Sequence, residues 1–301
     1  MRALVIGADG FAGRWLVRHL VESGDQVWAA GGPRFVPPLE DAVESVSLDV
    51  RDADAVTSYV RKSAPQAIYF LAGVSTYALR DDPELAIGIS VNGAMNVLLG
   101  CVGLPAPPRL LYVSTAYVYG SGSEPLTESS PERPTDVYPA AKLAGERALG
   151  SLAPVIGVDV VVARPFNHIG PGQRESFLVP TIARQIAAGG GRVSLRSTTT
   201  VRDFTDVRDV VRAYRLLVDR GKAGSVYNIA SGSGMSTTEL VDAMAAVAGV
   251  RVRLDATDPT SGVGDRMVGD AGRLRDLGWS PRHALDHTLR EVLAEWATRV
   301  P

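Results

Sequence analysis

The chain has 301 residues, of which 46% are hydrophobic and 21% charged, and its formal net charge at pH 7 is −2. This composition is typical of a globular protein with a sizeable apolar core. The lack of a basic excess argues against binding nucleic acid through a charged surface. No apolar stretch reaches the ~18 residues that a membrane span needs. A lone cysteine, Cys101, cannot form an internal disulfide and suits a reducing, cytoplasmic location.

The first half of the chain alternates short apolar runs with helical patterns. Val, Ile and Leu dominate the candidate strands Ala3–Ile6, Gln26–Ala30, Val43–Leu48, Ala67–Leu71, Arg109–Ser114 and Val158–Ala163. The helices predicted between them are Phe11–Ser23, Asp52–Lys62, Glu84–Val102 and Val137–Leu152. Such strands predict a parallel sheet covered on both faces. We therefore expect an α/β, Rossmann-like, doubly wound fold.

After Pro165 the pattern changes and predicts a smaller α+β lobe. Its helices are expected at Phe177–Ala188, Val207–Asp219, Thr237–Val247 and Leu285–Ala297, with short strands near Arg192–Leu195 and Val226–Ile229. We assign residues 1–165, plus about 205–225, to the Rossmann-like domain. Residues 166–204 and 226–301 are assigned to the smaller lobe.

A glycine-rich turn follows the first strand and opens a helix. Residues 7–13 read Gly-Ala-Asp-Gly-Phe-Ala-Gly, with the spacing G-x-x-G-x-x-G. Gly7 permits a tight turn, Gly10 lets the backbone approach a pyrophosphate, and Gly13 lets the helix pack on the sheet. The helix N-terminus offers free N–H groups to the phosphates. The turn therefore predicts a dinucleotide cofactor; the alternative is an ordinary strand–helix turn.

The end of the second strand bears on which dinucleotide is bound. NAD enzymes usually carry an acid there for the ribose hydroxyls, but residues 29–34 read Ala-Ala-Gly-Gly-Pro-Arg. Arg34 can meet a 2′-phosphate, so NADP(H) is favoured over NAD(H); the alternative is that Arg34 is a solvated loop residue. Asp49 and Val50, after the third strand, are expected near the adenine.

Tyr138 and Lys142 lie four residues apart on a predicted helix and so share one face. A tyrosine pKa near ~10 makes a poor acid–base at neutral pH, but a neighbouring ammonium and a cationic nicotinamide both favour the phenolate. The Tyr-x-x-x-Lys spacing is common by chance. It becomes specific in combination with the glycine turn and with Ser114 and Thr115 at a strand end. For these two hydroxyls, the alternative role is capping of that strand end.

On these motifs the chain resembles the extended short-chain dehydrogenase/reductases. The resemblance includes Val-Ser-Thr-Ala-Tyr-Val-Tyr-Gly at residues 113–120 and covers nearly the whole chain. It implies that Thr115 orients the substrate oxygen, Tyr138 gives the proton, and Lys142 tunes Tyr138 and holds the nicotinamide ribose. The implied cofactor contacts are Gly7, Gly10, Phe11, Gly13, Arg34, Asp49, Val50, Leu71, Ala72, Gly73, Tyr138, Lys142 and Pro165.

The second half resembles the nucleotide-sugar branch, and most of all GDP-4-keto-6-deoxy-D-mannose reductases. The matching segments are 164–173, 202–209 (Arg-Asp-Phe-Thr-Asp-Val-Arg-Asp) and Val-Gly-Asp at 268–270. The resemblance implies that Asn167 and Arg202 bind a diphosphate, which suits fork-shaped donors. Pairing of Arg202 with Asp203 or Asp206 is the alternative. His168 is expected to be structural rather than a base. The implied substrate contacts are Ser75, Ser114, Thr115, Asn167, Val179, Arg202 and Arg266.

Two departures from the family pattern limit this interpretation. Ala116 and Tyr117 stand where 4,6-dehydratases carry acids, which disfavours a dehydratase. Residues 260–266 replace an Arg-Pro-x-Asp stretch of the reductases, so GDP and dTDP both stay open, and Arg266 is a candidate replacement for that arginine.

The expected activity is NADPH-dependent reduction of a nucleotide-linked 4-keto-6-deoxyhexose at C4. A 4-epimerase with tightly held NAD would use the same residues. A catalytically silent cofactor-binding sensor or scaffold would usually have lost the Tyr or the Lys. No metal is expected. A homodimer is expected through the helices Glu84–Val102 and Val137–Leu152.

Overall fold

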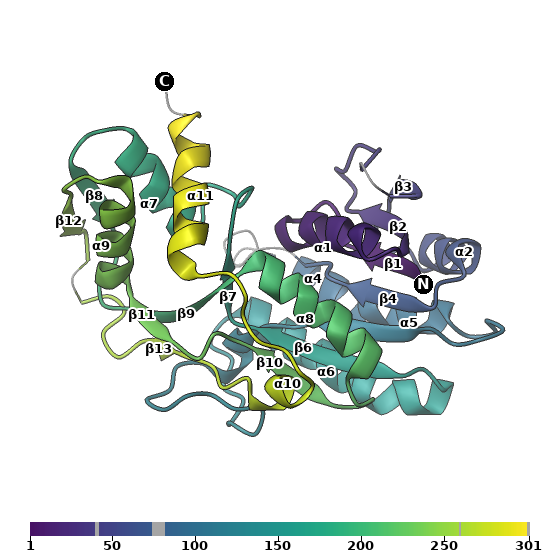
Figure 1. Cartoon of the computed structure of the whole chain (residues 1–301). Coiled ribbons are helices and arrows are strands. Elements are labelled where there is room, and N and C mark those ends of the chain that lie inside the picture. The colour runs from purple at the N-terminus through teal and green to yellow at the C-terminus, as the bar shows by residue number, and fades with distance from the viewer. Residues whose placement is uncertain (40–41, 74–81, 259, 300–301) are drawn as a thin grey trace.

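The computed structural model describes residues 1–39, 42–73, 82–258 and 260–299. Its main sheet has seven parallel strands in the order β10-β6-β5-β4-β1-β2-β3, with helices on both sides (Figure 1). The strands are β1 (Arg2–Ile6), β2 (Gln26–Gly31), β3 (Glu44–Ser47), β4 (Ala67–Phe70), β5 (Arg109–Val113), β6 (Val160–Pro165) and β10 (Val226–Ile229). The predicted Rossmann-like α/β fold is confirmed.

Successive residues of each strand point to opposite sides of the sheet. Because apolar residues occupy the positions on both sides, both faces of this sheet are apolar. In β1, Ala3 and Val5 join one buried cluster, whereas Leu4 and Ile6 join another. The first cluster is covered by α1 (Phe11–Glu22) and α8 (Val207–Arg220). The second is covered by α2 (Ala53–Ser63), α5 (Ala94–Gly100) and α6 (Val137–Ile156).

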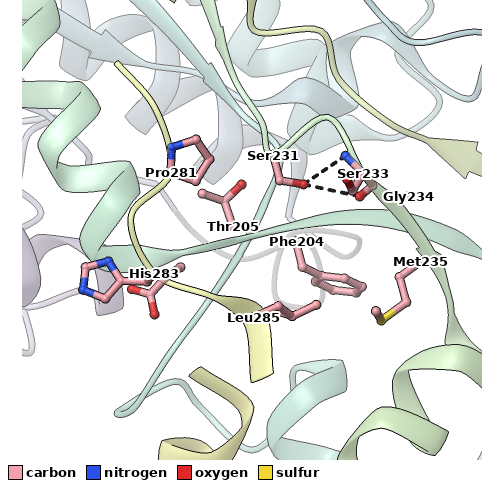
Figure 2. Close-up of a pocket in the computed structure, with 10 residues that line it drawn as sticks. Phe204, Thr205, Ser231, Ser233, Gly234, Met235, Pro281, His283 and Leu285 are labelled. Atoms are coloured by element: carbon pink, nitrogen blue, oxygen red, sulfur yellow. Dashed lines mark hydrogen bonds between the residues drawn. The ribbon is translucent and has the colours of Figure 1, made fainter. Parts of the chain in front are cut away.

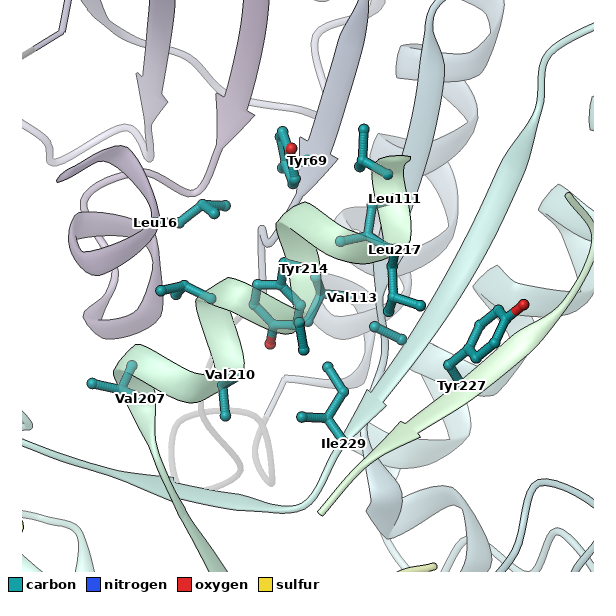
Figure 3. Close-up of a cluster of buried hydrophobic side chains, with 14 of the residues drawn as sticks. Leu16, Tyr69, Leu111, Val113, Val207, Val210, Tyr214, Leu217, Tyr227 and Ile229 are labelled. Atoms are coloured by element: carbon teal, nitrogen blue, oxygen red, sulfur yellow. The ribbon is translucent and has the colours of Figure 1, made fainter. Parts of the chain in front are cut away.

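Helix α8 shows why the chain returns from the smaller lobe to the main sheet. Val207, Val210, Tyr214 and Leu217 recur at helical spacing on one side of α8 and are all buried. Figure 3 shows these side chains gathered with Leu16 of α1 and with residues of the sheet strands. Residues 207–220 therefore complete the core of the Rossmann-like domain.

The smaller lobe, beside the main sheet in Figure 1, surrounds a separate apolar core. Its helices are α7 (Leu178–Ala187), α9 (Thr237–Ala248) and α11 (Leu285–Ala297). One sheet joins β7 (Asn167–Ile169), β9 (Val201–Asp206), β11 (Gly234–Ser236) and β13 (Arg266–Met267), and a second pairs β8 (Arg192–Leu195) with β12 (Arg253–Ala256). Among the described residues, no helix combines the length and apolar character that crossing a membrane requires.

Two expectations about the elements are wrong. Strand β10, assigned to the smaller lobe, pairs with β6 and forms the edge of the main sheet, and α10 (Gly272–Asp276) packs against it. The Rossmann-like domain therefore extends past residue 225 to include β10, and the chain returns to it once more at α10 before it enters the smaller lobe again at α11.

The helix expected at Glu84–Val102 is divided into α4 (Pro83–Ile87), a π-helical segment η1 (Gly88–Gly93) and α5. The backbone approaches its neighbours closely here, since a Cβ on Gly93 would lie 2.6 Å from Cγ2 of Val50.

Candidate active site

The glycine turn brings three backbone segments into close contact. Gly7 has φ +87°, and a Cβ there would lie 2.8 Å from the Ala72 nitrogen. A Cβ on Gly13 would lie 2.1 Å from the Gly7 carbonyl oxygen. Gly10 caps α1 without any side-chain hydrogen bond, and the first turn carries no acid. The N–H groups that begin α1 are therefore available to an anion, as a dinucleotide pyrophosphate requires.

Phe11 connects the glycine turn to the smaller lobe. Its ring stacks on His168, with centroids 5.9 Å apart and planes 3° from parallel. The Nδ1 atom of His168 lies 3.3 Å from the Phe166 carbonyl oxygen, and burial lowers the pKa of His168. A neutral, stacked imidazole bonded to the backbone fits the structural role expected from the sequence.

Ser114 and Thr115 stand at the end of β5 and differ in how their hydroxyls are used. The Thr115 Oγ1 accepts a hydrogen bond from Tyr117 N at 3.2 Å and so caps the short 3-10 helix η2 (Ala116–Tyr119). The Ser114 Oγ is buried and has no hydrogen-bond partner among the described residues. A buried hydroxyl without a partner costs free energy, so a polar ligand group at this strand end would satisfy it.

Tyr138 lies in the first turn of α6 and is half-buried. Burial, together with the nearby Tyr117, raises the pKa of Tyr138 to about 12, against the opposing effect of a hydrogen bond with the Thr115 side chain. The structure therefore places the side chains of Tyr138 and Thr115 close together.

Lys142 is 2% exposed, one turn after Tyr138. Its Nζ donates to the Ala72 carbonyl at 2.9 Å and to the Val113 carbonyl at 3.0 Å. Burial lowers the pKa of Lys142 to about 7, opposed by the charge of Glu146. The ammonium thus lies where β4 and β5 end, at the carboxyl edge at which open parallel sheets bind ligands.

A buried ion network lies behind Lys142, and the sequence analysis missed it. Arg164, 1% exposed, donates from Nε to Glu146 at 3.0 Å and from Nη2 to Glu132 at 2.6 Å. Glu146 follows Lys142 by one helical turn, which was the available sequence signal. The network ties α6 to the end of β6 and to the loop before α6.

The other expected cofactor residues lie at the same edge of the sheet with different environments. Arg34 is exposed after β2, whereas Val50 and Pro165 are buried. Asp49 is engaged by Arg51 through hydrogen bonds of 2.9 and 2.5 Å, which lower the pKa of Asp49. Leu71 and Ala72 are half-buried and Gly73 is exposed, and a Cβ on Gly73 would lie 3.4 Å from the Lys142 Nζ.

Three of the expected substrate residues come from one sheet of the smaller lobe. Asn167 lies on β7 and Arg266 lies on β13. Both of these strands pair with β9, which carries Arg202. All three side chains are half-buried.

The guanidinium of Arg202 is engaged within the chain. Its Nη2 contacts Asp265 Oδ2 at 2.5 Å, and its Nη1 donates to the Asp265 carbonyl at 3.1 Å. The alternative pairings of Arg202 are wrong, because Asp203 accepts from Ser231 and Asp206 pairs with Arg208.

Val179 and Ser75 were also expected to contact the substrate. Val179 is 1% exposed within the apolar core of the smaller lobe, so a substrate contact by its side chain is ruled out in this arrangement. Its position on α7 faces inward, which the sequence pattern did not reveal. Ser75 lies outside the described residues.

A separate cavity of about 210 Å³ lies between β9, β11 and the segment before α11 (Figure 2). Phe204, Thr205, Ser231, Met235 and His283 are among its lining residues, and none of the expected site residues lines it. Among residues 1–39, 42–73, 82–258 and 260–299, no cluster of three or more His, Cys, Asp or Glu side chains could hold a metal ion.

Comparison with known proteins finds relatives that match nearly the whole chain. A family model described as the NAD dependent epimerase/dehydratase family matches residues 3–230. The chain is 34% identical over 313 residues to GDP-6-deoxy-D-mannose reductase from Pseudomonas aeruginosa, covering 99% of this chain and 98% of that protein.

Solved structures cover the whole chain as well. RMD from Pseudomonas aeruginosa complexed with NADPH has a TM-score of 0.88 and 30% identity, with 100% of each chain covered. UDP-glucose 4-epimerase from Thermus thermophilus in complex with NAD has a TM-score of 0.88 and 27% identity, again with 100% of each chain covered. The resemblance drawn from the motifs is confirmed, and the chain belongs to the NAD dependent epimerase/dehydratase family of extended short-chain dehydrogenase/reductases.

Proposed function

We propose that the protein reduces the C4 carbonyl of a nucleotide-linked 4-keto-6-deoxyhexose, with GDP or dTDP as the nucleotide. The observation that carries the proposal is the meeting of Thr115, Tyr138 and Lys142 at the carboxyl ends of β4 and β5. The similarity to a GDP-6-deoxy-D-mannose reductase supports the class of substrate. A bound nicotinamide dinucleotide supplies the hydride.

The protein's own residues polarise the carbonyl and supply the proton. The Thr115 hydroxyl holds the carbonyl oxygen beside the Tyr138 hydroxyl, which donates its proton as the alkoxide forms. Burial raises the pKa of Tyr138, and a protonated Lys142 one turn away favours the phenolate that remains. Ser114 Oγ, which has no partner among the described residues, is available to a substrate or cofactor oxygen.

The substrate diphosphate is assigned to the smaller lobe. Arg202 and Asn167 lie on neighbouring strands, and Arg266 lies on the strand beyond Arg202. Guanidinium groups suit a diphosphate because their planar forks donate two hydrogen bonds at once. Arg266 is proposed to take the place of the arginine in the Arg-Pro-x-Asp stretch of similar reductases.

The cofactor is proposed to be NADP(H) in preference to NAD(H). Arg34 is exposed just after β2, where it can contact a 2′-phosphate. The similar RMD structure was obtained with NADPH.

The test is a reductase assay with GDP- and dTDP-linked 4-keto-6-deoxyhexoses, following the absorbance of the reduced nicotinamide and identifying the product by NMR. Tyr138→Phe is expected to lower kcat by at least ~10²-fold, the scale of a lost general acid. Its Kd for the cofactor should match that of the wild type. A variant that turns over at nearly the wild-type rate would contradict the assignment of Tyr138.

A nucleotide-sugar 4-epimerase is the second candidate, because a UDP-glucose 4-epimerase with NAD aligns over the whole chain. It would use the same Thr115, Tyr138 and Lys142. Interconversion of UDP-glucose and UDP-galactose without added cofactor, by protein that co-purifies with NAD, would favour the epimerase over the reductase. Retention of both Tyr138 and Lys142 argues against a catalytically silent sensor.

A further inference from the structure

A carboxylate reaches the end of β2 from the glycine turn. Asp9 is the third residue of that turn, and its Oδ1 accepts a hydrogen bond from Gly32 N at 3.1 Å. Gly32 follows β2 (Gln26–Gly31) directly. In Rossmann folds, this strand end is where an acid accepts hydrogen bonds from the adenosine ribose. The strand itself carries no acid here, but Asp9 brings one to the same place.

The local packing disfavours an acid at Gly31, the last residue of β2. A Cβ on Gly31 would lie 2.3 Å from Cγ of Phe35, a side chain that is 9% exposed. A carboxylate at position 31 would therefore displace a buried ring. The Asp9 carboxylate reaches the same strand end from the glycine turn, through its hydrogen bond from Gly32 N.

Two cations lie near the same strand end. Arg34 is exposed two residues after Gly32. Arg14 is exposed in the first turn of α1, and its Nε donates to the main-chain oxygen of Asp9 at 3.1 Å rather than to the carboxylate. The end of the site where the ribose is expected thus presents one carboxylate and two guanidinium groups.

We infer that Asp9 is a specificity-determining residue that accepts the ribose hydroxyls of NAD(H) and opposes the 2′-phosphate of NADP(H). A carboxylate and a phosphate repel each other, whereas two free hydroxyls donate to a carboxylate. Arg14 and Arg34 act in the opposite sense, so the protein binds both cofactors and its preference for NADP(H) is small. This inference rests on the proposed function only in requiring a nicotinamide dinucleotide, and it holds equally for a reductase or an epimerase.

The experiment measures the Kd of NADH and of NADPH by fluorescence titration without any sugar substrate. Asp9→Asn keeps an oxygen that can accept from Gly32 N and removes the charge. Wild type is expected to bind the two cofactors within about tenfold of each other, and Asp9→Asn to shift the ratio toward NADPH by at least about fivefold. The shift should shrink as salt is raised, because the site is partly exposed.

Asp159→Asn is the matched control, since it makes the same charge change at an exposed position. Asp159 lies just before β6, at the amino-terminal end of the strands and away from the cofactor site. Arg34→Ala should move the ratio toward NADH. If Asp9→Asn does not fold, Asp9→Ser tests the same point, because a hydroxyl can also accept from Gly32 N. An unchanged ratio in the folded Asp9 variant, or an equal shift in Asp159→Asn, overturns the inference. So does a wild type that binds NADPH more than about a thousandfold tighter than NADH. A failed sugar assay has no bearing on these binding constants, so it would affect the proposed function alone.

Discussion

The Lys142 side chain is buried, and its lowered pKa makes the stability of the protein depend on pH. Its pKa is lowered from 10.5 to about 7 in the folded protein, chiefly by burial. Between these two values the unfolded chain binds more protons than the folded chain, so the free energy of unfolding rises with pH. Below pH 7 both states are protonated and this contribution no longer changes.

Lys142→Met removes the titrating group while keeping an unbranched side chain. We expect the free energy of unfolding of the wild type to rise relative to Lys142→Met by up to about 1.4 kcal/mol per pH unit between roughly pH 7 and 9. Denaturant titrations of the cofactor-free proteins at several pH values measure this difference. Parallel curves for the two proteins would show that Lys142 keeps an ordinary pKa.

Arg202 offers a test of the proposed diphosphate site. Arg202→Ala is expected to raise KM for the nucleotide-sugar strongly, since losing one partner of a desolvated ion contact costs about 2–5 kcal/mol. Some of the loss should appear in kcat, because the remote nucleotide helps to position the sugar. Cofactor Kd should not change, since the glycine turn lies in the other lobe.

Arg253→Ala is the control for Arg202→Ala, because it removes an exposed arginine paired with Asp255 in the same lobe. Isothermal titration with a nucleoside diphosphate gives the comparison. If Arg202→Ala binds the nucleoside diphosphate as well as Arg253→Ala does, Arg202 does not hold the substrate.

The residues that sequence could identify are those whose partners are set by short spacing. The glycine turn, Tyr138 and Lys142 carry their pattern within seven residues or fewer. Asp265 could not be found this way, because it meets Arg202 across 63 positions of sequence. Asp9 escaped notice for a similar reason, since its role depends on a hydrogen bond to Gly32.

At the scale of elements, the strands of the main sheet and its covering helices were predictable because their apolar runs are continuous. Strands of the smaller lobe were harder. β9 reads Val-Arg-Asp-Phe-Thr-Asp, and its buried Asp203 is satisfied by Ser231, Gly232 and Gly269, all distant in sequence. β7 has three residues, too few to show a period. Such strands form because of tertiary contacts, which no local pattern reports.

Helix α6 contains two glycines with opposite environments, and they form a matched pair of variants. A Cβ on Gly145 would lie 2.4 Å from the Ser90 carbonyl oxygen and from the Tyr112 hydroxyl, whereas Gly150 has no atom within 4 Å. Gly145→Ala is expected to destabilise the protein by about 1–3 kcal/mol through overpacking against η1 and β5. Gly150→Ala should be neutral or stabilise by up to about 1 kcal/mol, because alanine favours helix. Thermal unfolding compares them; equal effects would contradict the close packing at Gly145.

At the scale of the whole molecule, the neighbouring helices α4, α5 and α6 carry several exposed apolar side chains. Exposed fractions are 47% for Ile87, 53% for Leu99, 48% for Val102, 42% for Leu152 and 81% for Val155, all on or beside α4, α5 and α6. We propose that these neighbouring helices form a homodimer interface, since exposed apolar side chains gathered on one part of a surface mark interfaces.

Light scattering at micromolar concentration should then give twice the chain mass of 31.8 kDa. Val155→Glu is expected to shift the protein toward the monomer, because a charge buried in an apolar interface is costly. Val250→Glu, at an exposed position of the smaller lobe, should leave the mass unchanged. A wild-type mass of one chain would count against the dimer.

The contact between Arg202 and Asp265 also determines how substrate affinity should respond to salt. Asp265 accepts from Ser121 Oγ at 2.6 Å as well as from Arg202, so it bridges the two lobes. A diphosphate that binds Arg202 would replace the Asp265 carboxylate as its anionic partner and would not neutralise an unpaired cation. Salt screens the outgoing pair and the incoming pair alike. The KM for the nucleotide-sugar should therefore vary less with ionic strength in the wild type than in Asp265→Asn, in which the Arg202 guanidinium has lost its ion pair with Asp265.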